Sequence, residues 1–234
     1  MKVEQKQRLR RFHRLRSVYY LLTELARFVT NSRPAVREQL VEAYAQGTDP
    51  WRYASLVRDR ERYALALEMV ARWQGERRPE ALEVGCGEGL FTRQLATRCS
   101  SVVGADISEV ALERARAACV NLPGVSFQRW DAVDDGSLGQ FDLVTAMDVM
   151  EIGWRPLAQR SAMKTVTGSV RDGGALLITV FLRSPVIEHA HWARWLGRGG
   201  NGVLARYVAV DRRLVVRELH RTDHHLIALL EAAD

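Results

Sequence analysis

Cysteine, proline and long apolar runs are all scarce in this chain of 234 residues. With 6 prolines, 17 glycines, 26% charged and 47% hydrophobic residues, the composition is globular and excludes collagenous, low-complexity and wholly disordered proteins. Apolar runs stay shorter than the roughly 18 residues of a membrane span, and the charged N-terminus lacks the apolar core of a secretory signal. We therefore expect a cytoplasmic protein with one catalytic α/β domain and a small accessory element.

The cysteines argue against both disulfides and metal clusters. There are 3 of them, Cys86, Cys99 and Cys119, an odd number at wide spacing. A disulfide framework, a CxxC zinc site or an iron–sulfur cluster needs paired or closely spaced thiols. We expect structural thiols, a reducing compartment and no metal.

The positive charge is confined to one end of the chain. The formal net charge is +6, and the first 16 residues supply all of it, because they carry Lys2, Lys6 and five arginines against Glu4 alone. Such an arm is more often the solvated face of a helix than a surface for phosphate or an acidic carrier protein. We therefore do not expect nucleic acid as a partner.

The first 48 residues have the pattern of a helical cap. From Val3 to Val29 there is no glycine or proline, and apolar residues recur every three or four positions, which predicts an amphipathic helix. After a break, a second helical stretch runs to about Ala45, and a further helix is predicted at 56–73. We assign residues 1–48 to the cap and residues 49–234 to the catalytic domain.

From residue 81 onward, short apolar runs alternate with helical stretches. The predicted strands are 81–84, 102–105, 125–129, 141–147, 175–181, 214–219 and 226–230. Strands separated by helices pair in parallel, whereas the last two runs are joined too closely for a helix and should pair antiparallel. The expected fold class is α/β: a doubly wound, seven-stranded, mostly parallel sheet with an antiparallel last strand, plus the N-terminal helical cap.

The strongest local motif is Glu83-Val84-Gly85-Cys86-Gly87-Glu88-Gly89, between the first predicted strand and a helix beginning near Leu90. Glycines let the backbone turn tightly and approach a ligand, and the N-terminus of the following helix favours a negative group such as a carboxylate. The G-x-G-x-G spacing is shorter than the dinucleotide fingerprint, and the Gly-Lys-Ser/Thr ending of a P-loop is absent. Both features disfavour NAD and ATP.

Carboxylates follow three further strands at the same sheet edge. Asp106 ends the second strand, where it can accept hydrogen bonds from both hydroxyls of a ribose. Asp131 ends the third strand, where it can accept from an adenine amino group. The fourth strand ends at Met147-Asp148 and would form the floor of a reactive centre. Taken singly, Asp106 and Asp131 also suit helix caps.

In this order, the motifs resemble those of class I S-adenosylmethionine-dependent methyltransferases over roughly residues 80–231. The resemblance implies that the glycine-rich loop cradles the methionine part of the cofactor and that Asp106 holds the ribose. Ile107 would pack on the adenine, whose edge Asp131 and Ala132 would read. The residues implied to bind S-adenosylmethionine in this core are Glu83, Gly85, Cys86, Gly87, Gly89, Asp106, Ile107, Asp131, Ala132 and Met147. Taken alone, Ile107 also suits the core and Gly89 a plain turn.

A narrower resemblance lies upstream, in the runs Asp49-Pro50-Trp51-Arg52-Tyr53 and Asp59-Arg60-Glu61-Arg62-Tyr63. They are similar to the NodS group, nodulation N-methyltransferases that act on an amino-sugar oligomer. The similarity implies that Trp51 stacks on the cofactor and that Arg62 pairs with its methionine carboxylate. The alternatives are a core role for Trp51 and a solvated helix charge for Arg62. Two features depart from the relatives: Ile152 stands where many small-molecule methyltransferases have histidine, and the cap is longer than a NodS-like chain needs.

Methyl transfer from a sulfonium is an in-line displacement, so it requires a positioned acceptor and exclusion of water rather than a protein nucleophile or a metal. The candidate bases are Asp148, at the end of the fourth strand, and His189 and His191, between the fifth and sixth strands. No third metal ligand is spaced near the two histidines, and His224 and His225 are interpreted as structural.

We predict a methyltransferase that uses S-adenosylmethionine to N-methylate a small-molecule acceptor, an amine of an amino sugar or specialised metabolite, with S-adenosylhomocysteine as the product. The preference for an amine depends on the resemblance alone. The alternatives are an O-methyltransferase of a natural product, an RNA or protein methyltransferase that uses the basic arm, and a non-catalytic module that only binds. Against RNA, the Asn/Asp-Pro-Pro-Tyr motif of amino-group nucleic-acid methyltransferases is absent at Asp148-Val149-Met150-Glu151.

Overall fold

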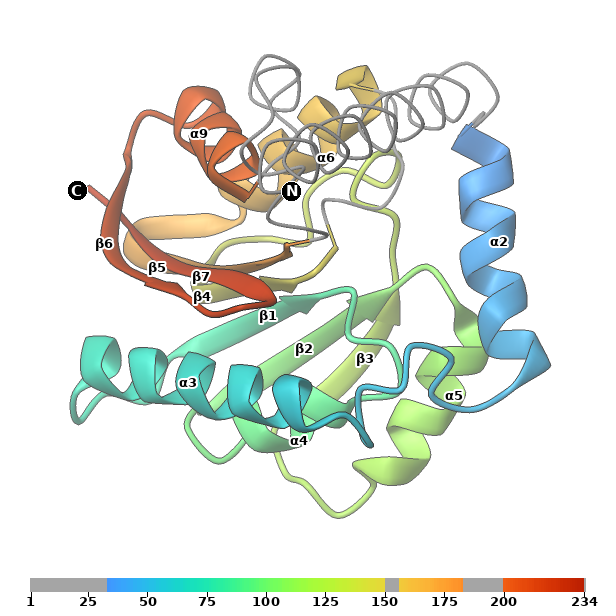
Figure 1. The fold of residues 1–234 in the computed structure, drawn as a ribbon. Helices are drawn as coiled ribbons and strands as arrows, with labels where there is room; N and C mark the ends of the chain where they lie inside the picture. The colour runs from blue at the N-terminus through green and yellow to red at the C-terminus, as the bar shows by residue number, and fades with distance from the viewer. Residues whose placement is uncertain (1–32, 150–155, 183–199, 234) are drawn as a thin grey trace, which may run out of the picture.

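The computed structural model describes residues 33–149, 156–182 and 200–233 (Figure 1). The helix predicted at residues 3–29 and the candidate bases His189 and His191 lie outside these ranges. The helices are α2 (Arg33–Gln46), α3 (Val57–Gln74), α4 (Leu90–Leu95), α5 (Glu109–Ala118), α6 (Pro156–Gly168) and α9 (Gly200–Val210). The strands are β1 (Glu80–Val84), β2 (Ser101–Asp106), β3 (Val125–Arg129), β4 (Phe141–Met147), β5 (Val170–Phe181), β6 (Leu214–Arg221) and β7 (His225–Ala232).

The strands form one 7-stranded sheet in the order β3-β2-β1-β4-β5-β7-β6. Every pair from β3 to β5 is parallel, and β7 runs antiparallel to both of its neighbours. The predicted fold class, with its antiparallel last strand, is confirmed. Because the chain builds the sheet outward from β1 in one direction and then returns to place β4 on the other side, the order reverses between β1 and β4. In doubly wound sheets, ligands bind at the carboxyl ends of the strands beside such a reversal.

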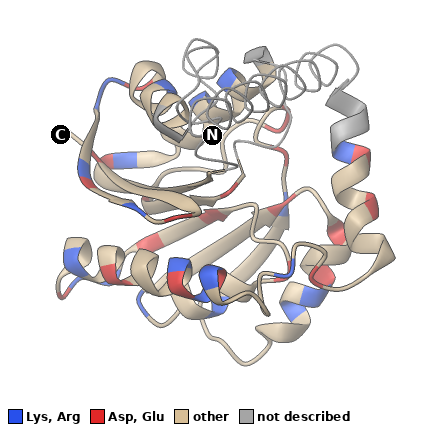
Figure 2. Ribbon diagram, in the orientation of Figure 1, with Lys and Arg blue, Asp and Glu red and all other residues tan. Residues whose placement is uncertain are grey.

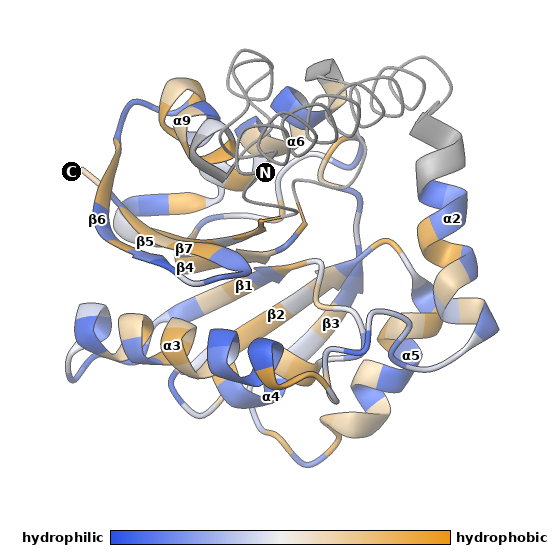
Figure 3. Ribbon diagram, in the orientation of Figure 1, coloured by the Kyte–Doolittle hydropathy of each residue, from blue (hydrophilic) through white to orange (hydrophobic). Residues whose placement is uncertain are grey.

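Two layers of helices cover the sheet, α3 and α4 on one face and α6 and α9 on the other (Figure 1). Successive strand residues point to opposite faces, so Val144 packs in the cluster with α6 and α9, whereas Leu143 packs in the cluster with α3 and α4. Apolar residues accordingly dominate the central strands (Figure 3). Burial on both faces explains why the central strands read as continuous apolar runs in the sequence.

Charged side chains of both signs are interspersed along α3, as Figure 2 shows. Arg72 on this helix pairs with Glu68 and with Glu218 of β6. Among the described residues, no helix combines the length and the apolar character that crossing a membrane would require.

The fifth strand begins earlier than its apolar run. It starts at Val170 rather than Ala175, and its pairing with β4 is irregular between Phe141 and Leu143. Asp172-Gly173-Gly174 therefore lies within the strand, whereas the predicted strand began after it, at residue 175. A side chain at Gly174 would lie 2.8 Å from the carbonyl oxygens of both Arg171 and Asp142, so the close approach of two backbones requires glycine there.

Candidate functional site

The glycine-rich loop follows β1 at the point where the strand order reverses. Gly85, Gly87 and Gly89 have φ values of 70°, 53° and 77°, a left-handed region that favours glycine. Neighbours approach the loop closely: a Cβ at Gly85 would lie 2.5 Å from Val149 Cγ2, and one at Gly87 would lie 2.6 Å from Tyr44 Oη. Glycine is therefore required at these positions both by the backbone conformation and by the close packing of Val149 and Tyr44.

Two side chains of the loop motif point into the protein. The Glu83 carboxyl is buried and accepts a hydrogen bond from the Thr92 hydroxyl at 2.6 Å. Burial raises the pKa of Glu83 to about 8, so this group holds its proton at neutral pH. The Cys86 thiol is also buried, which raises its pKa well above the usual value. Both side chains therefore support the loop from the protein interior.

Asp106 lies at the end of β2 and ties its own turn to the loop. Oδ2 accepts from the Gly87 N–H and Oδ1 from the Ser108 N–H, both at 2.9 Å. Burial raises the pKa of this carboxyl, which is 8% exposed. The N-cap of α5 is Ser108, whose hydroxyl accepts from Ala111, so the alternative role of Asp106 as a cap is wrong. Each carboxylate oxygen keeps a lone pair that a hydroxyl can use.

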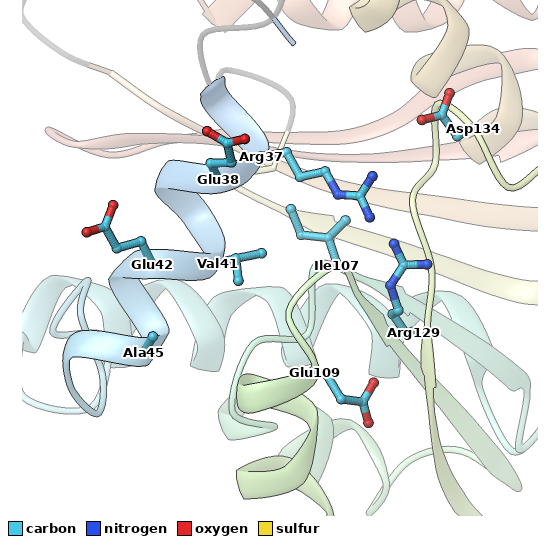
Figure 4. Close-up of a pocket in the computed structure, with 9 residues that line it drawn as sticks. All are labelled: Arg37, Glu38, Val41, Glu42, Ala45, Ile107, Glu109, Arg129 and Asp134. Atoms are coloured by element: carbon cyan, nitrogen blue, oxygen red, sulfur yellow. The ribbon is translucent and has the colours of Figure 1, made fainter. Parts of the chain in front are cut away.

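A cavity of about 900 Å³ separates α2 from the ends of β2 and β3. Figure 4 shows Ile107 directed into it, with the side chains of Arg37 from α2 and Arg129 from β3 extending toward the same space. Ile107, which the sequence placed on the adenine, therefore faces open space rather than the core. Asp131 and Ala132, the other predicted adenine contacts, are buried at the end of β3, where Asp131 Oδ1 accepts from the Val133 N–H at 2.9 Å.

The connection between α2 and α3 is fastened to the loop by Glu88. One carboxylate oxygen accepts from the Asp49 N–H at 3.0 Å, and the other pairs with Arg114 at 2.7 Å. Arg114 also donates to the Gly47 carbonyl at 2.8 Å. Trp51 in this connection is 42% exposed, so the alternative that it anchors the core is wrong. Its predicted stacking on the cofactor stays a prediction.

Tyr44 is a site residue that sequence reasoning missed. It lies on α2, is buried, and places its hydroxyl over Gly87. Burial, together with the nearby Asp106 carboxylate, raises its pKa, and Trp51 interacts with the same hydroxyl. No local motif marks Tyr44, because only the packing of α2 brings it to the loop.

A buried ionic cluster lies at the end of β4. The Asp148 carboxylate accepts from Arg62 Nη1 and from Thr179 Oγ1, the latter at 2.7 Å. His225 Nε2 lies 3.3 Å from Asp148 Oδ2 and 3.8 Å from Asp59 Oδ1. Burial alone would raise the pKa of Asp148, but His225 and Arg62 hold it below its usual range. A carboxylate held this way is a weak proton acceptor.

Arg62 is 1% exposed, so the alternative that it is a solvated helix charge is wrong. Nη1 contacts both Asp148 and Thr179, and Nη2 forms an ion pair with Asp59 Oδ1 at 3.3 Å. Nε has no hydrogen-bond partner among the described residues. Its predicted pairing with the cofactor stays a prediction. Met147, the residue before the cluster, packs with α3 and α4.

Comparisons with known proteins agree with this geometry. Residues 81–174 match the family model described as a methyltransferase domain. Nodulation protein S of Bradyrhizobium diazoefficiens is 34% identical over 112 residues, which cover 48% of this chain and 53% of that protein. The ubiquinone biosynthesis O-methyltransferase of Acinetobacter baumannii is 29% identical over 110 residues, 45% of either chain. This chain thus matches these relatives over about half of their length.

Among solved structures, the N-methyltransferase NodS from Bradyrhizobium japonicum WM9, in complex with S-adenosylhomocysteine, superposes with a TM-score of 0.69 at 21% identity. The match covers 85% of this chain and 99% of that one. The fold expected from the sequence motifs is confirmed, and residues 81–174 match a methyltransferase domain.

Proposed function

We propose that this chain, which carries a class I S-adenosylmethionine-dependent methyltransferase domain similar to that of NodS, transfers a methyl group to an amine of a small molecule. The observation that carries the proposal is the link between the glycine-rich loop and Asp106. The Gly87 N–H donates to Asp106 Oδ2 at 2.9 Å, so the loop and this carboxylate lie together at the reversal of the sheet, where ligands of doubly wound sheets bind.

The residues present fit S-adenosylmethionine. The positive φ values of the loop glycines leave room for close backbone approach, which the methionine part requires. Asp106 would accept from the ribose, and Ile107 would contact the adenine in the cavity beneath α2. Glu83, neutral at pH 7, would place no second negative charge below a bound carboxylate.

When bound, S-adenosylmethionine supplies an electrophilic methyl group on a sulfonium. Transfer of that methyl group to the nitrogen of a neutral amine would break the carbon–sulfur bond, move the positive charge to the amine and leave S-adenosylhomocysteine as the product. The protein holds the two partners in line and excludes water. An alkylammonium must first lose one proton, which a weak base or water can accept. We retain His189 and His191 as candidate bases ahead of Asp148, whose lowered pKa makes it the weaker acceptor.

Mass spectrometry of products tests the acceptor class. The protein is incubated with S-adenosylmethionine and either a free amino sugar or its N-acetyl derivative, which keeps every hydroxyl but has no basic amine. We expect one methyl group on the free amine and none on the acetylated control. Equal methylation of both would overturn the amine proposal in favour of O-methylation, which the similarity to the ubiquinone biosynthesis O-methyltransferase supports.

A macromolecular acceptor is the second candidate, because residues 1–16 are strongly basic. Deleting these residues distinguishes the two classes. We expect the truncated chain to keep its affinity for S-adenosylhomocysteine and its activity on small amines. Salt-dependent methylation of RNA or protein by the full chain, lost on truncation, would instead assign the arm to a macromolecular substrate.

We further propose that residues 1–48 form a cap on the methyltransferase domain of residues 49–234. Contacts between α2 and α5, and the seating of Tyr44 on Gly87, support this division. We place the reaction in the cytoplasm, since Cys86, Cys99 and Cys119 are free and buried, as suits a reducing compartment.

A further inference from the structure

The buried cluster at the end of β4 joins four elements that are far apart in the sequence: α3, β4, β5 and β7. We propose that Asp59, Arg62, Asp148 and His225 form a positioning cluster that holds the end of β4 against the glycine-rich loop and so sets the affinity for the cofactor. The inference rests on the proposed function, because it assigns residues to the same site.

Asp148 is the residue that the cluster fixes. Its backbone φ of 57° is unusual for a residue other than glycine, so this conformation needs support from its surroundings. The support comes from Thr179, which accepts from the Asp148 N–H at 3.1 Å and donates to Oδ1 at 2.7 Å. Arg62 and His225 contact the other carboxylate oxygen, Oδ2. The turn after β4 is therefore held through both its backbone and its side chain.

The residue after Asp148 links it to the glycine-rich loop. Val149 packs against the apolar core beside α6 and α9. Its Cγ2 lies so close to Gly85 that a Cβ on the glycine would be 2.5 Å away. Gly85 in turn donates its N–H to the Ala105 carbonyl at 2.7 Å, next to Asp106. A shift of Asp148 would move Val149, and with it the loop that we expect to cradle the methionine part.

The position of His225 between two carboxyl groups explains why it belongs to the cluster. Arg62 supplies one positive charge to two carboxyl groups, Asp59 and Asp148, and these side chains are almost fully buried. Burial raises the pKa of Asp59, which favours a proton within the cluster. His225 faces both carboxyl groups and offers them a further partner. Removing it would take away one of the buried partners of the Asp148 carboxylate, and the end of β4 would lose one of its contacts.

In the part of the chain that the structure describes, Arg58 and aromatic rings also surround the cluster. Arg58 Nε lies 3.5 Å from Asp59 Oδ2, but that arginine is 40% exposed and its guanidinium lies over the Phe181 ring. The rings of Tyr53 and Tyr63 flank the Arg62 guanidinium, at 5.1 Å and 4.7 Å. Asp59, Asp148 and His225 have potential metal-ligand atoms within 4.8 Å of one another, yet Arg62 already supplies a cation to both carboxylates.

A double-mutant cycle tests the proposal. The dissociation constant of S-adenosylhomocysteine is measured by calorimetry for the wild type, His225→Gln, Val149→Ala and the double variant, each shown to be folded by circular dichroism. We expect each single change to weaken binding about tenfold. Because both changes act along one chain of contacts, the double variant should also bind only about tenfold more weakly than the wild type. His220→Gln is the matched control, since His220 pairs with Glu218 on β6, and it should bind as the wild type does.

The outcomes separate this inference from the proposed function. A folded wild type that does not bind S-adenosylhomocysteine contradicts the proposed function. Wild-type binding with unchanged affinity in the folded His225→Gln variant, or losses that multiply to about a hundredfold in the double variant, overturns the positioning role alone. If His225→Gln does not fold, Thr179→Val replaces it in the cycle, because it removes the hydroxyl contact to Asp148 and leaves every charge in place. Unchanged affinity in that variant is equally decisive against the role.

Discussion

Two buried carboxyl groups of the site, Glu83 and Asp148, have pKa shifts in opposite directions because their partners differ. Glu83 is surrounded by protein and bonded to a hydroxyl, so its pKa rises, whereas Asp148 is buried beside Arg62 and His225, so its pKa falls. Glu83 is the last residue but one of β1, and Asp148 directly follows β4. The sequence indicated a different role for each, Glu83 at the cofactor loop and Asp148 as a candidate base, but gave no direction for either pKa. Their different partners make one a neutral support and the other a fixed anion.

Glu83 should make the protein less stable as the pH rises. Its pKa is about 8 in the folded state and about 4.3 in the unfolded state, so its contribution is fully present below the unfolded value and is lost as pH rises through the folded one. Between pH 5 and pH 8, the free energy of unfolding should fall by up to about 1.4 kcal/mol per pH unit from this group. Glu83→Gln should remove that slope.

Urea unfolding of both proteins across this pH range measures the slope. Glu76→Gln, at an exposed loop position, is the control and should keep the slope of the wild type. Parallel curves for the wild type and Glu83→Gln would show that Glu83 does not titrate in this range, against its assigned burial.

His191→Ala should slow methyl transfer and leave the affinity for S-adenosylhomocysteine unchanged. A general base contributes typically about 10² to 10⁴ in rate and does not need to contact the cofactor. Single-turnover kinetics with saturating cofactor measure the first effect and calorimetry the second. A normal rate would eliminate His191 and leave His189 as the remaining histidine to test.

At the scale of elements, α2 and the glycine-rich loop constrain each other. Gly87→Ala should destabilise the protein for two reasons: alanine is strained at a φ of 53°, and its methyl group would overlap the Tyr44 hydroxyl. Tyr44 is buried, so its ring can move away only if α2 moves with it. We expect a loss of about 1–3 kcal/mol beyond the backbone strain.

The variant Gly136→Ala measures the backbone strain without a steric overlap. Gly136 has a similar φ of 74°, but a Cβ there would have no neighbour within 4 Å. The difference between the two variants in urea unfolding therefore measures the overlap with Tyr44. Tyr44→Phe should recover part of the loss in the Gly87→Ala background. Equal destabilisation of Gly87→Ala and Gly136→Ala would contradict the seating of α2 on the loop.

Elements with a clear local pattern of residues were predictable from the sequence. The β4 prediction matches the observed bounds, because buried parallel strands are short apolar runs with clear ends. The early start of β5 was not predictable, because its first residues pair with β4 through an irregular register around Gly173 and Gly174, and the pattern there reads as a turn. The loop glycines were recognisable because their spacing reflects a backbone requirement that no other residue meets.

At the scale of the whole molecule, topology brings together residues that no local pattern connects. Asp59, Asp148 and His225 come from three separate elements, and they meet only because β7 inserts antiparallel beside β5 while α3 crosses the same face. The sequence therefore indicated only a structural role for His225, at the start of a strand. Asp106 was recognisable because it ends the strand next to the glycine-rich loop, a position that the sheet order fixes.

Calorimetric titration of S-adenosylhomocysteine into the wild type and Asp106→Ala tests the central claim most directly, because it needs no knowledge of the acceptor. Asp172→Ala, which changes an exposed carboxylate paired with Arg213, serves as the control. We predict micromolar binding by the wild type and the control, and loss of measurable binding by a folded Asp106→Ala variant. Unchanged affinity in Asp106→Ala, or no binding by the folded wild type, would contradict the account.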